Sequence, residues 1–172
     1  MRVLMVSVVA LLLLTGFTGS ESLEVDSQGN SIDYNGDGHP DVTYDYYKEY
    51  FYEFIDRNYD LKTDVSNKFN YKDNLPIQTT YDNNFDGYPD TKVFYQNGWV
   101  DYSFVDTNKD NKFDVFYSYE YGILKFSEKY IAATNDKSAY IEKIEYELGY
   151  PVKTTRVQTS ITRDKFQRAR SK

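Results

Sequence analysis

Short segments in which apolar or aromatic residues alternate with polar ones recur along most of the chain. Alternation with a period of two, rich in Tyr and Val, predicts β-strands whose two faces differ in polarity. The clearest examples follow four aspartate-rich segments, where one face of each expected strand carries Val42, Tyr44 and Tyr46; Val65, Asn67 and Phe69; Thr91, Val93 and Tyr95; or Val115, Tyr117 and Tyr119. The strands that lead into these segments are less regular, and their stripes are Tyr50, Tyr52 and Phe54, and Val100, Tyr102 and Phe104. This pattern predicts an all-β fold.

The four aspartate-rich segments share a nine-residue pattern, Asp-x-Asn-x-Asp-x-x-x-Asp. The copies are DYNGDGHPD at 33–41, DRNYDLKTD at 56–64, DNNFDGYPD at 82–90 and DTNKDNKFD at 106–114. Their first residues are 23, 26 and 24 positions apart, a spacing that indicates a repeat architecture. The residues of each copy are called positions 1 to 9 of the loop.

A second turn is expected between consecutive aspartate-rich loops. Asn97-Gly98 is a strong signal for a two-residue hairpin turn, and Gly122 and Asn74 stand 24 residues after and before Gly98. Each repeat is therefore expected to be two antiparallel strands, with an aspartate-rich loop at one end and a tight turn at the other. Strands connected in this way form an antiparallel meander of about 8–10 strands, open or rolled up, with all four loops along one edge.

The last part of the chain lacks the aspartate pattern but keeps the hairpin signal. Gly149 lies at the same phase as Gly98, so residues 140–147 and 152–158 are expected to form a terminal hairpin without metal. A helix over 139–148 is the alternative, because the apolar residues there also fit a period of 3.6. Residues 160–172 are expected to be a basic, solvated tail, frayed or helical, with binding to acidic polymers as the alternative.

The aspartate-rich loops carry the chemistry of a metal site. Alternate residues of a tight loop direct carboxylate and amide oxygens toward one centre, and the carbonyl of position 7 can add another; calcium takes about six to eight such ligands. A hairpin turn rich in Asp and Asn, without metal, is the alternative for each loop. The candidate ligands are Asp33, Asn35, Asp37, His39 and Asp41; Asp56, Asn58, Asp60 and Asp64; Asp82, Asn84, Asp86, Tyr88 and Asp90; and Asp106, Asn108, Asp110, Lys112 and Asp114, where His39, Tyr88 and Lys112 offer only their carbonyl groups.

Positions 1, 3, 5, 7 and 9 resemble the start of the EF-hand calcium loop, with Gly38 and Gly87 at its turn position 6. The EF-hand glutamate at position 12 is missing from all four copies. An acid at position 9 is more similar to the DxDxDGxxD calcium loops of FG-GAP and VCBS-type repeats, which join two β-strands, and thrombospondin type 3 repeats have similar acids. The resemblance implies Ca²⁺ as the bound ion. Leu61 at the turn position makes the second loop the weakest expected site, whereas Asn111 in the fourth tolerates a left-handed backbone.

The N-terminus indicates export. Arg2, an apolar run over 3–14 and small residues up to Ser20 are typical of a cleaved secretory signal, which we assign to residues 1–20. The chain has no Cys, so disulfides and thiol chemistry are excluded, and a bacterial source is favoured. A single β-repeat domain is expected at 21–159, followed by the basic tail at 160–172.

Charge is divided unevenly along the chain. Residues 21–124 carry 21 acidic and 8 basic residues, whereas residues 125–172 carry 6 acidic and 11 basic ones. Twelve of those 21 acids are loop aspartates, so the acidity indicates a supply of metal ligands. Its sign disfavours nucleic-acid binding.

These features favour a non-enzymatic calcium-binding module, with a binding or structural role at the cell surface or outside the cell. An unidentified protein or glycan is the expected partner, and no membrane span is expected in the mature chain. His39 is the only histidine and stands in a loop, so no Ser-His or Cys-His arrangement can be built. A carbohydrate-binding module that uses Trp99 and the Tyr-rich sheet face is the alternative, and a secreted hydrolase based on paired carboxylates is the third candidate.

Overall fold

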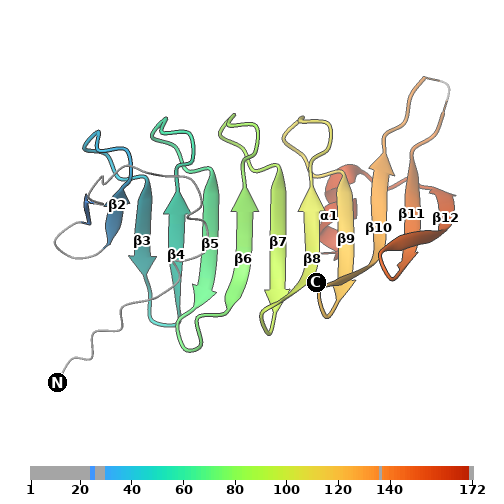
Figure 1. The fold of residues 1–172 in the computed structure, drawn as a ribbon. Coiled ribbons are helices and arrows are strands. Elements are labelled where there is room, and N and C mark those ends of the chain that lie inside the picture. Colours follow the sequence, from blue (N-terminus) through green and yellow to red (C-terminus); the bar gives the residue numbers. More distant parts are fainter. Residues whose placement is uncertain (1–23, 26–29, 136, 171–172) are drawn as a thin grey trace.

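The computed structural model describes residues 24–25, 30–135 and 137–170, and most of them belong to one antiparallel β-sheet (Figure 1). The predicted signal peptide at 1–20 lies outside the described residues. The strands are β1 (Glu24–Val25), β2 (Ser31–Asp33), β3 (Val42–Tyr46), β4 (Tyr50–Ile55), β5 (Val65–Asn70), β6 (Pro76–Tyr81), β7 (Thr91–Gln96), β8 (Trp99–Val105), β9 (Val115–Glu120), β10 (Ile123–Ile131), β11 (Tyr140–Glu147) and β12 (Tyr150–Gln158), and the helix is α1 (Arg163–Arg170).

Every strand pairs with its neighbours in the chain and with no other described strand. The order runs from β1 to β12 without a crossover, so the sheet is a meander. β1 and β12 are the two outermost strands and do not pair with each other, so the sheet is open. The predicted all-β meander is confirmed. The described part of the chain holds twelve strands, rather than the about 8–10 expected from the hairpin pattern.

Four strands begin where the loop pattern ends. The residue after the last loop aspartate is the first residue of β3, β5, β7 and β9. Three of these residues are Val and one is Thr, which are β-branched and suit an extended backbone. The strand positions predicted from alternation after each loop are therefore confirmed.

Three turns at the sheet edge opposite the loops have two central residues, both in the left-handed region. Their φ angles are 52° and 80° at Asn97-Gly98, 51° and 75° at Tyr121-Gly122, and 50° and 84° at Leu148-Gly149. Cross-strand pairs close each turn directly, as Gln96 with Trp99 shows. Positive φ at both positions is the type I′ turn, whose twist matches that of the flanking strands. The hairpins predicted at Gly98, Gly122 and Gly149 are confirmed. At the equivalent position Asn74 the connection between β5 and β6 is longer, covering residues 71–75, so the two-residue turn expected there is not found.

The C-terminal hairpin is a strand pair, not a helix. β11 covers Tyr140–Glu147 as expected, and β12 covers Tyr150–Gln158, two residues longer at its start than predicted. Because Leu148-Gly149 forms a two-residue turn, pairing starts immediately beside it, at Glu147 and Tyr150.

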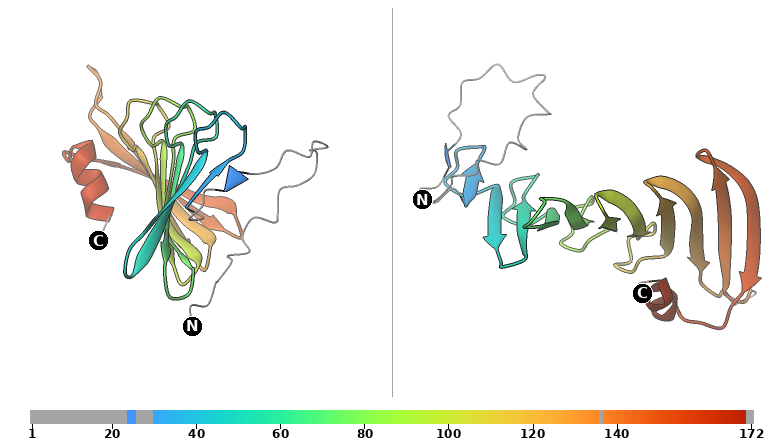
Figure 2. Two further views of the ribbon diagram at one scale, coloured as in Figure 1. Left: turned by 90° about the vertical axis from the view of Figure 1, so that its left-hand side faces the viewer. Right: turned by 90° about the horizontal axis from the view of Figure 1, so that it is seen from below.

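The C-terminal segment is helical, one of the two expected forms, but it docks on the sheet and is not a solvated tail. α1 lies on one side of the sheet, behind it in the view of Figure 1 and to the left in the edge-on view of Figure 2. The Phe166 side chain is fully buried and packs with Phe104 and Phe116. The partly buried residues around this cluster are Phe94, Tyr102, Phe113, Phe126, Tyr130, Ile141 and Ile161. Phe166, the only large apolar residue of α1, thus anchors the helix to the apolar C-terminal half of this face.

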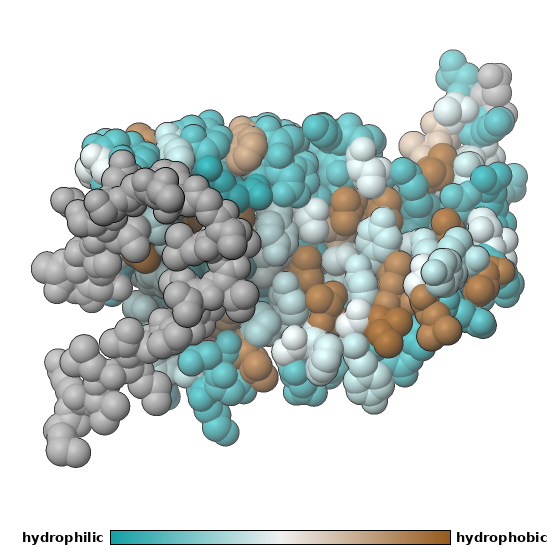
Figure 3. All heavy atoms as spheres, viewed as in Figure 1, coloured by the Kyte–Doolittle hydropathy of each residue, from teal (hydrophilic) through white to brown (hydrophobic). Residues whose placement is uncertain are grey.

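The opposite face, called the open face, mixes apolar and aromatic side chains with small polar ones. Figure 3 shows this face, with apolar residues in brown gathered over the C-terminal half of the sheet. A row of hydrogen bonds crosses its N-terminal half, from the Tyr44 hydroxyl to Glu53 (2.9 Å), from the Asn67 amide to Glu53 (2.8 Å) and from the Thr79 hydroxyl to Asn67 (2.8 Å). Burial and the Glu53 carboxylate together raise the pKa of Tyr44. Asn67, which interrupts the apolar stripe, is thus part of a polar network.

The tight turns allow a test of local strain. Tyr121 and Leu148 have left-handed backbones, a conformation that costs most residues roughly 1–2 kcal/mol and that Asn tolerates. Their side chains are 77 % and 90 % exposed, so little packing is lost on substitution. Tyr121→Asn and Leu148→Asn are each expected to raise the free energy of unfolding by about 1 kcal/mol in chemical denaturation. Tyr121→Ala and Leu148→Ala are the controls, and an equal gain from Ala would contradict the backbone explanation.

Candidate metal-binding loops

The four aspartate-rich loops lie side by side along one edge of the sheet, at the top in Figure 1. Each is closed by a backbone hydrogen bond from the N–H of position 9 to the carbonyl of the residue before position 1. The donors and acceptors are Asp41 and Ile32 (2.8 Å), Asp64 and Ile55 (2.8 Å), Asp90 and Tyr81 (2.8 Å), and Asp114 and Val105 (2.9 Å). The predicted placement of all loops at one edge is therefore confirmed.

Neighbouring loops are joined by the same two positions. The N–H of position 1 donates to the carbonyl of position 9 in the preceding loop, as in Asp56 to Asp41 (2.8 Å), Asp82 to Asp64 (2.7 Å) and Asp106 to Asp90 (2.8 Å). Two strand spacings separate one loop from the next, so equivalent positions recur roughly every 10 Å along the edge. A shallow depression between the first two loops includes Asp41, Asp56 and Leu61 in its lining.

The aspartate at position 1 accepts hydrogen bonds from the backbone of its own loop. Asp33 accepts from Gly36 (2.7 Å) and Gly38 (2.9 Å), and Asp56 accepts from Tyr59 (2.7 Å) and Leu61 (2.7 Å). Positions 4 and 6 have positive φ in all four loops, which turns successive N–H groups inward. Such an arrangement forms a concave binding place for an anion, and the position-1 carboxylate occupies it.

The aspartate at position 9 closes the other side of the loop. Its carboxylate accepts from the N–H of position 2, at 2.7 Å from Tyr34, 2.6 Å from Arg57, 2.8 Å from Asn83 and 2.6 Å from Thr107. The aspartates at positions 1 and 9 are 3–9 % exposed, apart from Asp33, which is half-buried. Both positions therefore hold the loop backbone as well as being candidate ligands.

Positions 3 and 5 fold back over the loop. In the third loop the amide oxygen of Asn84 accepts from the N–H of Asp86 (3.0 Å), and the carboxylate of Asp86 accepts from the N–H of Tyr88 (2.9 Å). The first and second loops repeat both contacts. These are Asx turns, in which the side chain bonds the backbone two residues on. All four position-5 carboxylates remain exposed.

The structure places the predicted ligands in order around each loop but does not draw their acidic groups into one cluster. No three side chains of Asp, Glu, His or Cys come together as a metal-binding group in the described ranges. Positions 1, 3, 5 and 9 offer side-chain oxygens and position 7 offers a carbonyl oxygen. These are the ligand types that hard cations such as calcium prefer. Gathering them around an ion requires the exposed position-5 carboxylate to turn inward.

The loops differ in charge. The first and third have three aspartates and no basic residue, a formal charge of −3 each, whereas Arg57 and Lys62 in the second and Lys109 and Lys112 in the fourth reduce the charge to −1. Ion pairs in the described part follow the same division. Lys62 lies 3.5 Å from Asp60 in the second loop, and in the fourth Lys129 lies 3.5 Å from Asp114 and Arg163 lies 2.6 Å from Asp110. The carboxylates of the first and third loops have no such partner among the described residues, although Arg57 Nη2 donates to the backbone carbonyl of Asp82 (2.5 Å).

Two features of the loops were not visible in the sequence pattern. Position 4 has a left-handed backbone although it is occupied by Gly36, Tyr59, Phe85 and Lys109, which share no chemical property. The contact of Arg163 with the fourth loop joins residues 53 positions apart, and no local pattern predicts it. At position 6 the turn backbone is left-handed in all four loops, and Leu61 adopts a φ of 67° that Gly would adopt more easily.

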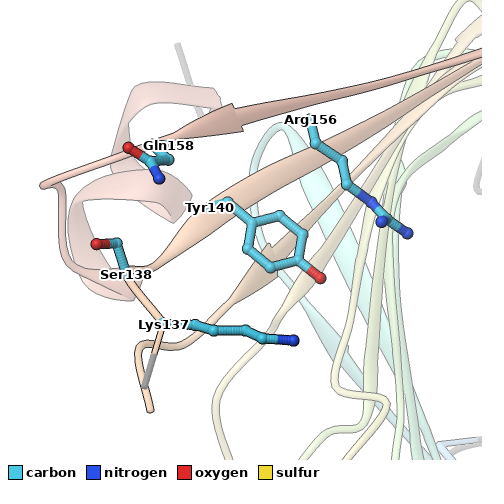
Figure 4. Close-up of a pocket in the computed structure, with 5 residues that line it drawn as sticks. All are labelled: Lys137, Ser138, Tyr140, Arg156 and Gln158. Atoms are coloured by element: carbon cyan, nitrogen blue, oxygen red, sulfur yellow. The ribbon is translucent and has the colours of Figure 1, made fainter. Parts of the chain in front are cut away.

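Another depression lies at the far end of the sheet, between β11 and β12. Figure 4 shows the residues that line it, Lys137, Ser138, Tyr140, Arg156 and Gln158. Arg156 donates a 2.6 Å hydrogen bond to Glu142, and none of the described residues that line the depression is acidic.

In sequence, the chain matches no protein-family model and no curated protein. Within the described residues, no helix has the length and apolar character needed to span a membrane.

The two roles of the loop aspartates can be separated by mutation in metal-free buffer. Asp82→Ala removes a buried carboxylate that accepts from the N–H of Gly87 at 2.7 Å, and losing a hydrogen bond to a charged group costs about 1.5–3 kcal/mol. Asp86→Ala removes an exposed carboxylate of the same loop and should cost within about 0.5 kcal/mol. Urea unfolding in the presence of a chelator gives both values. Equal destabilisation by the two variants would contradict the structural role of position 1.

Proposed function

We propose that this chain is an exported calcium-binding repeat protein that acts as a non-enzymatic binding or structural module at the cell surface or outside the cell. One observation carries the proposal. The loops at 33–41 and 82–90 each have a charge of −3 with no ion pair among the described residues, although most of their position-1 and position-9 carboxylates are buried.

Carboxylates confined to one loop repel one another. Two unit charges 4 Å apart interact by about 1 kcal/mol in bulk water and by more near a protein surface, where the effective dielectric constant is lower. A divalent cation reduces the charge of such a loop from −3 to −1. In the third loop the ion would be held by Asp82, Asn84, Asp86, Asp90 and the Tyr88 carbonyl, and in the first by Asp33, Asn35, Asp37, Asp41 and the His39 carbonyl.

Calcium suits this donor set better than magnesium. Carboxylate, amide and carbonyl oxygens in a flexible loop satisfy the large and irregular coordination of calcium, whereas magnesium requires a near-octahedral shell at about 2.0–2.1 Å. The second loop should bind more weakly, because Leu61 is at the turn position and Lys62, 3.5 Å from Asp60, competes for its carboxylate.

Bound calcium would stiffen an edge of a thin structure. α1 packs over the C-terminal half of the sheet, and no second layer covers the N-terminal half in the described part of the chain. An ion that binds only the folded loop stabilises it by mass action. Ions in the first and third loops would therefore rigidify the half of the sheet that has least packing, as expected for a structural or binding module.

Carbohydrate binding is the second candidate, favoured by exposed aromatic rings. Trp99 is 59 % exposed, and Tyr47 stacks on Tyr50 with ring centroids 4.8 Å apart while remaining 49 % exposed. Flat exposed rings are suited to stacking on sugar rings. Binding on a glycan array that is lost in Trp99→Ala would support this function, and its absence would leave the calcium module alone.

Calcium titration tests the proposed function. We expect isothermal titration to show heat from at least the first and third loops, with affinities of about 10⁻⁴–10⁻³ M, typical of extracellular modules. Asp86→Ala should remove the contribution of the third loop, and magnesium should bind more weakly. Asp45→Ala is the matched control, since Asp45 is an exposed aspartate outside the loops. No binding heat up to millimolar calcium would contradict the proposal.

A further inference from the structure

The fourth loop already holds a cation from another part of the chain. Arg163, at the start of α1, donates from Nη1 to Oδ1 of Asp110 (2.8 Å) and from Nη2 to Oδ2 of Asp110 (2.6 Å). Nη1 also lies 3.4 Å from the carbonyl oxygen of Lys112. A guanidinium that engages both oxygens of a carboxylate is among the stronger ion pairs of proteins, because two parallel hydrogen bonds fix its geometry.

These contacts fall on two positions that calcium binding requires. Asp110 is position 5 of the loop and Lys112 is position 7, the carboxylate and the carbonyl expected to face the ion. Lys129 adds a second positive charge, 3.5 Å from the Asp114 carboxylate, and donates to the Thr107 hydroxyl at 2.9 Å. The fourth loop is therefore the most fully neutralised of the four within the described residues.

α1 is held at this place by three further contacts. Phe166 is fully buried and its ring centroid lies 6.0 Å from that of Tyr130. Gln167 donates to the carbonyl of Phe113, which is position 8 of the same loop, at 2.7 Å. Arg170 pairs with Glu128 on β10. With the helix anchored by Phe166 and Arg170, the Arg163 guanidinium is presented to the loop.

We propose that α1 withholds the fourth loop from calcium: Arg163 occupies the oxygens of Asp110 and Lys112, so that docking of Arg163 and binding of calcium at 106–114 exclude one another. The proposal rests on the proposed calcium function and deepens it, because a helix of the same chain would control whether calcium can bind one of the four similar loops. None of the other loops has an arginine on its position-5 carboxylate and position-7 carbonyl in the described residues.

Residue-resolved calcium titration by NMR of the full-length chain tests this exclusion. In the wild-type protein, calcium should shift the amide signals of Gly38 and Gly87 but not those of Asn111 and Lys112. In Arg163→Ala the Asn111 and Lys112 signals should also titrate, giving one additional site per chain. Arg163→Lys keeps a positive charge but cannot form the paired hydrogen bonds, so it should give an intermediate response.

Two control variants identify the cause. Arg168→Ala removes an exposed arginine of the same helix, so calcium should still leave the Asn111 and Lys112 signals unchanged. Arg163→Ala combined with Asp110→Ala should lose the additional site again, and circular dichroism verifies that each variant is folded.

Two results would overturn the exclusion alone. One is a calcium-induced shift of the Asn111 signal in the wild-type chain. The other is no shift of Asn111 in folded Arg163→Ala while the Gly87 signal does shift. If calcium shifts the Asn111 signal in Arg163→Ala but leaves the Gly38 and Gly87 signals unchanged, the exclusion is supported and the proposed calcium binding of the first and third loops is overturned. No response in any loop of either protein would overturn both.

Discussion

The structure depends on buried carboxylates that hold the backbone of each loop. Left-handed residues at positions 4 and 6 point successive N–H groups toward the inside of the loop, where each needs a hydrogen-bond acceptor. The position-1 aspartate provides it, and the position-9 aspartate binds the N–H of position 2. The same two residues carry the backbone hydrogen bonds that close one loop and join it to the next. The spacing of the strands and the spacing of the loops are therefore fixed together.

The carboxylates gathered in each loop repel one another, and this repulsion is offset in different ways in the four loops. Each loop concentrates three carboxylates, and the backbone N–H groups that they accept carry only partial positive charge. Basic side chains balance the second and fourth loops in part, and in the fourth loop an arginine from a distant helix contributes. In the described residues no basic side chain pairs with a carboxylate of the first or third loop, and Arg57, which reaches the third loop, bonds the Asp82 carbonyl instead. An external cation is therefore the simplest partner for these carboxylates. A single loop pattern can thus give both candidate ion sites and a site filled by the protein itself.

Much of the fold could be predicted because its signals are local. Alternation sets the strands, the last loop aspartate marks the start of the next strand, and Gly98, Gly122 and Gly149 mark the tight turns. The docking of α1 could not be predicted in this way, because the packing partners of Phe166 are distant in sequence. They come together only when the sheet places Phe104, Phe116 and Tyr130 beneath the helix. The order of the candidate ligand positions around each loop follows from the repeat pattern, but their hydrogen bonds to the loop backbone depend on left-handed residues that the sequence does not mark at position 4.

The most direct test of calcium as the missing charge is the melting temperature of the full-length chain in calcium and in chelator. An ion at about 10–100 times its Kd adds about 1.4–2.7 kcal/mol per site to the free energy of unfolding. For a domain of this size each 1 kcal/mol raises the melting temperature by roughly 2–4 °C, so two occupied loops should raise it by about ten degrees. A melting temperature that is the same in millimolar calcium and in chelator would show that the loops are turns held by hydrogen bonds alone.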